Sequence, residues 1–217
     1  MAVELIPSEP MRSVASMTAI EELLSIDAGP IAGQTITGAA PEALIREADL
    51  DHCALSGVDI QGAVVRSSAF SRCTFDGCNL SNVEWVGTVF TECSFTGCKL
   101  VGSDWSRAGL SMLPRPTITF TQCIVDYSSF MGSNLSRARF VDCSLMEADF
   151  SDAKLTGAVL QDCKLGSARF HNTDLRQADL RESTGFSLDP RVNRTHGLQI
   201  SLTETPALLE AFGIAVA

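Results

Sequence analysis

The chain has 217 residues, enough for one domain with a sizeable core. Its 16 Lys and Arg residues against 26 Asp and Glu residues give a net charge of −10, which argues against direct nucleic-acid binding because phosphates need positive partners. No secretory signal and no run of roughly 20 apolar residues is visible, so we expect a cytoplasmic protein with reduced thiols and no membrane partner.

Residues 1–42 are predicted to be an N-terminal extension that caps the following domain. Within it, SMTAIEELLS (16–25) has the spacing of a short amphipathic helix, and residues 1–15 are expected to be disordered.

Residues 43–183 follow a strict five-residue period. Every fifth residue from Leu50 to Leu180 is large and apolar in 26 of 27 cases, and Arg115 is the one exception. The position two residues earlier is small, apart from Leu113 and Ile118. A period of five fits neither a single helix nor a flat strand, and fixed-period self-similarity is typical of a solenoid. One large and one small inward residue can form one side of a square coil, so four units would close a turn of 20 residues.

Eight cysteines share the small inward position, which argues against a metal cluster or a disulfide framework. The 20-residue turn predicts three columns of buried, free thiols: Cys53, Cys73 and Cys93; Cys78 and Cys98; Cys123, Cys143 and Cys163.

Units such as ADFSD (148–152), AKLTG (153–157) and ADLRE (178–182) resemble the A-(D/N)-L-x-x unit of pentapeptide-repeat proteins. The resemblance implies an all-β fold, a right-handed quadrilateral β-helix of about seven 20-residue coils with short terminal helices.

The repeat is interrupted once, at residues 111–117, where Pro114 and Pro116 flank Arg115. The phase is the same on both sides, so we infer that no residues are inserted. We interpret this break as a hinge or bulge between two stacks, 43–112 and 118–183; a tolerated surface defect is the alternative.

Residues 184–217 are predicted to form a C-terminal cap helix and tail. Thr203 or Thr205 can cap the helix, Pro206 suits its first turn and Gly213 suits its end. The apolar residues Leu208, Leu209, Phe212 and Ile214 are our candidates for a homodimer interface.

Nothing in the sequence indicates an enzyme, a cofactor or a metal site: the three histidines are scattered and no phosphate loop or nucleophile motif is present. We therefore expect a binding surface or a scaffold.

The ending SLTETPALLEAFGIAVA and the preceding LDPRVNR resemble the C-terminal segment of gyrase-protecting pentapeptide-repeat proteins, the group of Qnr, MfpA, AlbG and McbG. That resemblance implies a dimeric DNA mimic that binds DNA gyrase, a type II topoisomerase, and protects it from quinolones or from toxins such as albicidin. The Qnr members carry large projecting loops. An uninterrupted frame favours the loop-free AlbG character and self-immunity.

The candidate gyrase-facing residues are Asp142, Asp162 and Glu182, which the repeat places one turn apart on one face. A solvated face explains the same column equally well. A protein-interaction scaffold without a topoisomerase partner is the alternative function.

Overall fold

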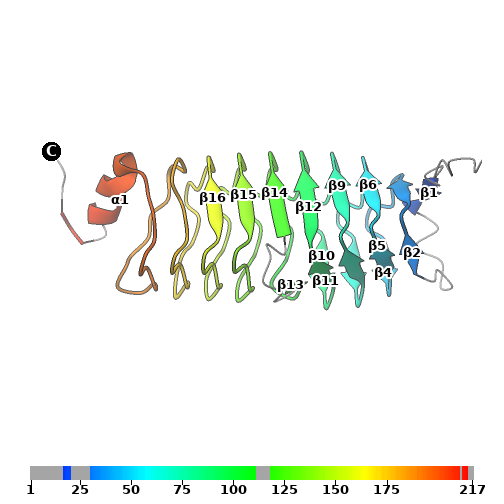
Figure 1. Ribbon diagram of the computed structural model, residues 1–217, viewed down its shortest axis with the longest axis horizontal. Helices are drawn as coiled ribbons and strands as arrows, with labels where there is room; N and C mark the ends of the chain where they lie inside the picture. Colours follow the sequence, from blue (N-terminus) through cyan, green and yellow to red (C-terminus); the bar gives the residue numbers. More distant parts are fainter. Residues whose placement is uncertain (1–16, 21–29, 111–117, 211, 215–217) are drawn as a thin grey trace, which may run out of the picture.

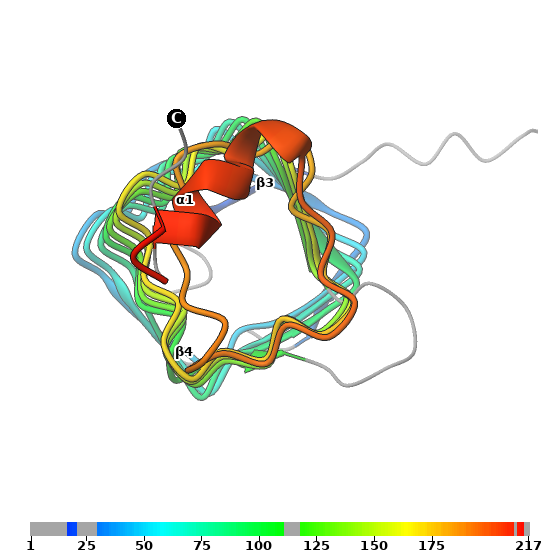
Figure 2. The same cartoon turned by 90° about the vertical axis from the view of Figure 1, so that its left-hand side faces the viewer.

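The computed structural model describes residues 17–20, 30–110, 118–210 and 212–214. The chain winds into a parallel β-solenoid whose coils are stacked side by side along one axis (Figure 1). Seen along that axis the coil is four-sided (Figure 2), and we name the sides A to D in chain order. The predicted fold class is confirmed.

Three of the four sides are sheets of short parallel strands. Side A has eight: β1 (Met17–Ala19), β3 (Thr35–Thr37), β6 (Ala54–Ser56), β9 (Thr74–Asp76), β12 (Cys93–Thr96), β14 (Ile118–Thr121), β15 (Arg139–Val141) and β16 (Val159–Gln161). Side C has β4 (Leu44–Arg46), β7 (Val64–Arg66) and β10 (Glu84–Val86). Side D has β2 (Ile31–Ala32), β5 (Asp49–Asp51), β8 (Ala69–Ser71), β11 (Val89–Thr91) and β13 (Gly109–Leu110). Side B is held by single parallel bridges from Ala39 through Asp59 and Lys99 to Thr184.

The five-residue unit explains this architecture. The large central residue and the small residue two positions earlier both point inward and are buried, as in Cys73 and Phe75. The residue two positions after the centre turns the corner with a positive φ, as in Gly77 (60°) and Asn82 (56°). Each unit therefore makes one side and one corner, and the apolar centres stack between coils.

The interior is dominated by aromatic stacks. Along side A, the ring centroids of Phe75, Phe95, Phe120 and Phe140 are separated by 4.3, 4.9 and 4.8 Å, with interplanar angles of 11°, 16° and 7°. Side C carries Trp85 and Trp105. Offset aromatic pairs add stabilisation beyond the burial of their area.

The coil length changes once, between Leu110 and Ile118. Phe75 pairs with Phe95 at a separation of 20 residues, but Phe95 pairs with Phe120 at a separation of 25. Bridges on sides B and C show the same step, from Lys99 to Ile124 and from Asp104 to Ser129. The coil that contains this step is therefore 25 residues long, and five of its residues are not part of the paired sides of the solenoid. The inference that the frame contains no insertion is wrong, because a five-residue insertion leaves a five-residue period in phase.

The break is also not a hinge between two stacks. β12 and β14 pair over four residues, and the Phe95 and Phe120 rings stack across the step. The walls on both sides thus form one continuous solenoid. Pro114, Arg115 and Pro116 themselves lie outside the described residues.

The solenoid extends beyond the predicted limits of 43 and 183. β2 and β3 pair with β5 and β6, and β1 forms a strand where a helix was predicted. At the other end, Arg194 bridges Asp174 and Gln199 bridges Asp179. A 3-10 helix, η2 (Leu202–Glu204), and α1 (Thr205–Glu210) then lie across the C-terminal end of the coil (Figure 2). Residues 1–15 lie outside the described part of the chain.

Deleting residues 112–116 is expected to leave the fold intact, because the deletion returns the longer coil to 20 residues and keeps every described pairing. Thermal unfolding should shift by only a few degrees, the range of a roughly 1 kcal/mol change. Loss of the cooperative transition would show that the five residues are needed for coil closure.

Candidate functional site

The predicted acidic column lies on the corner between sides A and B. Asp142, Asp162 and Glu182 are all exposed, and their φ values of 53°, 55° and 64° place each at the corner position of its coil. Gln122 precedes them in the same column, with φ 54°. In the coils before the register step, this corner is occupied by Gly57, Gly77 and Gly97. The carboxylates are therefore confined to the C-terminal half of the rod.

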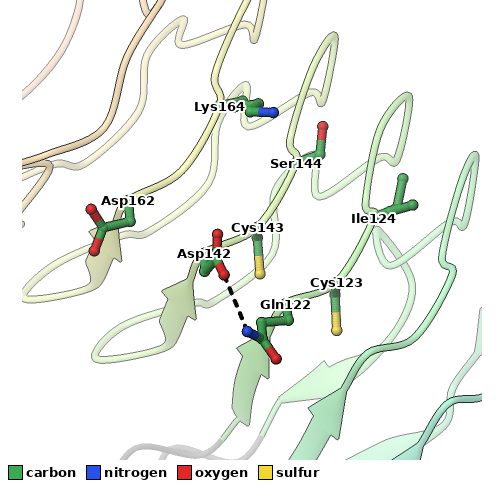
Figure 3. Close-up of a pocket in the computed structure, with 8 residues that line it drawn as sticks. All are labelled: Gln122, Cys123, Ile124, Asp142, Cys143, Ser144, Asp162 and Lys164. Carbon is green, nitrogen blue, oxygen red and sulfur yellow. Dashed lines mark hydrogen bonds between the residues drawn. The ribbon is translucent and has the colours of Figure 1, made fainter.

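A shallow groove runs beside this column. It is lined by Gln122, Asp142 and Asp162 on the corner and by Ile124, Ser144 and Lys164 on side B (Figure 3). Gln122 Nε2 donates to Asp142 Oδ2 over 3.3 Å. A second groove, on side A, is lined by Gln161, Asp179, Arg181 and Glu182. The first groove has the carboxylates of Asp142 and Asp162 on one edge and the single lysine Lys164 on the other. This charge balance suits a basic partner better than an anionic one.

Another set of aspartates is used internally. In the sequence pattern Asp-x-Arg, each of Asp174, Asp179 and Asp189 accepts two hydrogen bonds from the guanidinium two residues later. Asp149 and the same three residues also accept a backbone N–H two residues on, a hydrogen bond typical of aspartates in turns. These three Asp-x-Arg carboxylates are paired with arginine side chains of their own chain.

Acid is expected to weaken the C-terminal coils through this pairing. The Arg176 guanidinium holds the pKa of Asp174 below its ordinary value, and Arg181 does the same for the pKa of Asp179. A depressed folded-state pKa contributes stability above the unfolded value of about 3.9, and that stability is lost as pH falls through the folded pKa. The thermal midpoint should fall below about pH 4 more steeply in the wild type than in Asp174→Asn. Equal losses between pH 5 and pH 3 in both proteins would contradict this assignment.

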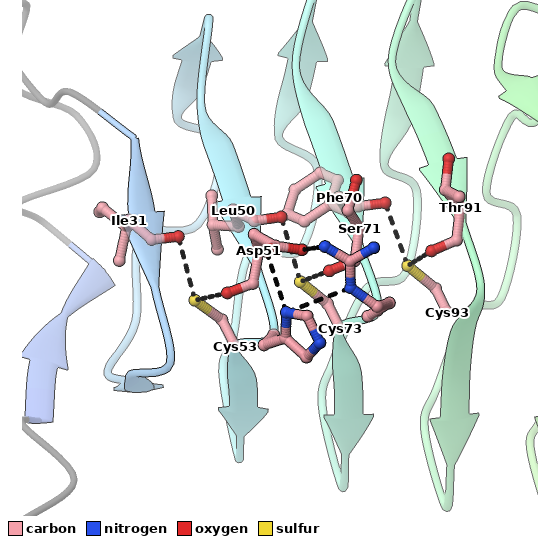
Figure 4. Close-up of polar contacts among 11 residues, drawn as sticks. Ile31, Leu50, Asp51, Cys53, Phe70, Ser71, Cys73, Thr91 and Cys93 are labelled. Atoms are coloured by element: carbon pink, nitrogen blue, oxygen red, sulfur yellow. Dashed lines mark hydrogen bonds and ion pairs between the residues drawn. The ribbon is translucent and has the colours of Figure 1, made fainter. Parts of the chain in front are cut away.

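The eight cysteines are all free and buried, as predicted. Seven of the thiols donate to the carbonyl of the central residue in the preceding coil, for example Cys73 Sγ to Leu50 O (3.4 Å) and Cys93 Sγ to Phe70 O (3.3 Å) (Figure 4). Ser103 and Thr88 make the same bond at their coils. Small donors are thus interchangeable here, and burial raises the pKa of the Cys53 thiol.

The cysteine columns need one correction. Because the register step adds five residues, Cys123 Sγ reaches Phe95 O, directly after Cys98 Sγ on Phe75 O. Cys78, Cys98, Cys123, Cys143 and Cys163 therefore form one column rather than two. Within the described ranges, no group of three or more His, Cys, Asp or Glu residues could hold a metal ion.

An exposed charge cluster that the sequence did not indicate lies at the corner between sides D and A. Arg72 Nη2 donates to Asp51 Oδ1 (2.5 Å), and His52 Nδ1 lies 2.9 Å from Asp51 Oδ2 (Figure 4). The hydrogen bond from Arg72 keeps the pKa of Asp51 low. The charged groups of this cluster are paired with one another, so the cluster offers little unpaired charge to a binding partner.

The candidate dimer residues lie at the C-terminal end of the rod. Leu208 and Leu209 are half-buried, whereas Phe212 and Ile214 are 46% and 50% exposed. Gly213 has φ 73°, and the Ile214 N–H donates to the Leu209 carbonyl (3.1 Å), the bond that closes a Schellman motif. The Arg191 guanidinium lies 5.4 Å from the centre of the Phe212 ring. This end therefore presents apolar side chains to solvent.

The chain is similar in sequence to pentapeptide-repeat families. A family model described as "Pentapeptide repeat region" matches residues 116–185, and one described as "Pentapeptide repeats (8 copies)" matches residues 68–107. No curated protein gives a significant match. Among the described residues, no helix is long and apolar enough to cross a membrane.

Two solved structures are similar in fold to this chain. Both are trypsin-treated variants of QnrB1, a plasmid-mediated fluoroquinolone resistance protein. One has a TM-score of 0.58 at 18% identity, covering 87% of this chain and 100% of QnrB1; the other has 0.55 at 19% identity, covering 86% and 99%. HetL, involved in heterocyst differentiation regulation in the cyanobacterium Nostoc sp. strain PCC 7120, has a TM-score of 0.33 at 18% identity, covering 78% and 86%. The repeat models and the four-sided solenoid together identify the chain as a pentapeptide-repeat protein.

Proposed function

We propose that this protein binds a type II topoisomerase, DNA gyrase, as a mimic of DNA and protects it from a toxin or antibiotic. The observation that carries the proposal is the exposed corner column of Asp142, Asp162 and Glu182, whose carboxylates have no basic residue between them in the column. A gyrase surface that binds DNA must be basic, and an acidic edge on a narrow rod is complementary to it.

Local charge, rather than total charge, supports mimicry. Residues 43–183 hold 13 Lys and Arg and 17 Asp and Glu, a net charge of only −4. Within the column, one carboxylate recurs per coil, about every 4.8 Å. One DNA strand carries a charge about every 3.4 Å. The corner thus approaches the charge spacing of one strand over a short distance.

The register step bears on which inhibitor the protein resists. An uninterrupted frame favoured an AlbG-like protein over a Qnr-like one, but the wall leaves out five residues between Leu110 and Ile118. The five-residue period therefore gives no reason to exclude quinolones as the inhibitor. Albicidin-type toxins and quinolones are both included in the proposal, as self-immunity or as acquired resistance.

The proposal includes a homodimer joined through the C-terminal ends. Phe212 and Ile214 are exposed there, and Leu208 lines an apolar hollow with Leu198 and Ile200. Phe212→Asp is expected to shift the protein to monomer in light scattering, because it places a charge in the apolar contact. Tyr127→Phe serves as a control far from this end. An oligomeric state unchanged by Phe212→Asp would remove this interface.

Direct binding is the test of the partner. Immobilised protein should bind purified gyrase, and linear duplex DNA should compete for it as salt-dependent electrostatic contacts require. Binding that DNA does not affect would contradict mimicry. No binding at micromolar gyrase would favour the alternative, an interaction scaffold without a topoisomerase partner.

A further inference from the structure

Tyr127 has an unusual backbone conformation. Its φ of 58° is left-handed, a region that is unfavourable for bulky side chains. The other described non-glycine residues with positive φ are Glu, Asp, Asn, Gln, Ser, Arg or His. At the same corner, between sides B and C, earlier coils have Asn82 and Gly102, which tolerate this conformation. The conformation is shared by the other described corners, but among the non-glycine ones Tyr127 is the aromatic residue, and a bulky side chain held there is a reason to look for function.

The tyrosine also belongs to an exposed apolar patch. Tyr127 is 61% exposed and Met146 is 45% exposed. The Tyr127 N–H donates to the Met146 carbonyl (2.9 Å), so these two residues stand on adjacent coils at one corner. A contiguous exposed patch of large side chains marks an interaction site more often than scattered ones do.

The patch is held rigidly and is bordered by acid. Asp126 Oδ1 accepts both the Met146 N–H (2.9 Å) and the Ser144 hydroxyl (2.6 Å), which ties the two coils together. Glu147 follows Tyr127 in the same corner column and is exposed. An aromatic face with a carboxylate one coil away suits an arginine or lysine side chain, through a cation–π contact and an ion pair.

We propose that the corner patch of Tyr127 and Met146, with Glu147, is the anchoring contact for gyrase, receiving a basic side chain beside an apolar one. This inference rests on the proposed function and adds a site that the acidic column does not include. Protein interfaces are commonly fixed by a few aromatic and methionine residues near their centre, with charged groups around them. The acidic column then supplies attraction and the patch supplies most of the residence time.

Variants at Tyr127 can separate binding from folding. Tyr127→Asn suits the left-handed corner, so its thermal midpoint should equal or exceed that of the wild type. Its affinity for gyrase should nevertheless fall at least about tenfold, mainly through a faster off-rate. Tyr127→Phe keeps the ring and should stay within about threefold of the wild type. Glu147→Gln should weaken binding and reduce its salt dependence.

The matched control is Val89→Ser, which changes a residue 42% exposed on side D and should leave binding unchanged. If wild-type protein binds gyrase and Tyr127→Asn binds equally well, the patch is not the anchor and the proposed function still stands. If wild-type protein does not bind gyrase, the proposed function and this contact are both overturned. An equal loss in Val89→Ser would also overturn the assignment, because the effect would not be specific to the patch.

Discussion

Phe120→Ala is expected to be the most destabilising single substitution at the register step, lowering the free energy of unfolding by about 3–5 kcal/mol. The Phe120 ring is fully buried and stacks on Phe95 (4.9 Å) and Phe140 (4.8 Å), so its removal leaves a cavity between three coils. It also removes one of the aromatic contacts that join the coils across the step, while the stack of Trp105 on Phe130 remains. Chemical denaturation monitored by circular dichroism measures the change.

Leu44→Ala is the control for this substitution, because Leu44 is 47% exposed on side C and its truncation should cost about 1 kcal/mol or less. A loss in Phe120→Ala no larger than that of Leu44→Ala would mean that the coils on either side of the step are not packed as one core.

Neutralising the corner column should have the largest effect on protection. In Asp142→Asn/Asp162→Asn, two adjacent carboxylates are lost while Asn still tolerates the left-handed corner, so the fold should persist. We expect at least about tenfold more protein to be needed for half-maximal protection of gyrase, the equivalent of about 1.4 kcal/mol. A supercoiling titration measures this directly.

Asp152→Asn is the matched control for the column variant. Asp152 is an exposed corner aspartate with φ 58°, but it lies on the corner between sides C and D. Equal losses in both variants would show that total charge matters rather than the column. No loss in either would leave the column as a solvated surface.

The fold could be predicted because each five-residue unit carries its own burial pattern. The large central residue and the small residue two positions earlier are enough to predict which side chains point inward, the cysteines included. No knowledge of distant contacts is needed. The register step could not be detected from periodicity, because five extra residues keep the phase. The signals that marked the break were Arg115, the only charged residue in the central series, and the bulky or proline residues beside it, and none of these reveals a change in coil length.

The N-terminal end was harder to predict because the lengths of its coils are not multiples of five. Ile31 pairs with Leu50 and Thr35 with Ala54, a separation of 19, and Met17 pairs with Thr35 at 18. Their inward residues therefore fall out of the frame that marks the central coils. The acidic column could be placed because corner residues also repeat. The repeat also places Tyr127 at a corner, but the positive φ of the corners is visible only in the structure.

The most direct measurement of the central claim is a gyrase supercoiling assay with purified protein, run with and without albicidin and ciprofloxacin. We expect the protein to restore supercoiling in the presence of at least one of them, in a dose-dependent way that the Asp142→Asn/Asp162→Asn variant loses. Failure to restore activity with either compound, together with no effect on uninhibited gyrase at high protein concentration, would contradict the account.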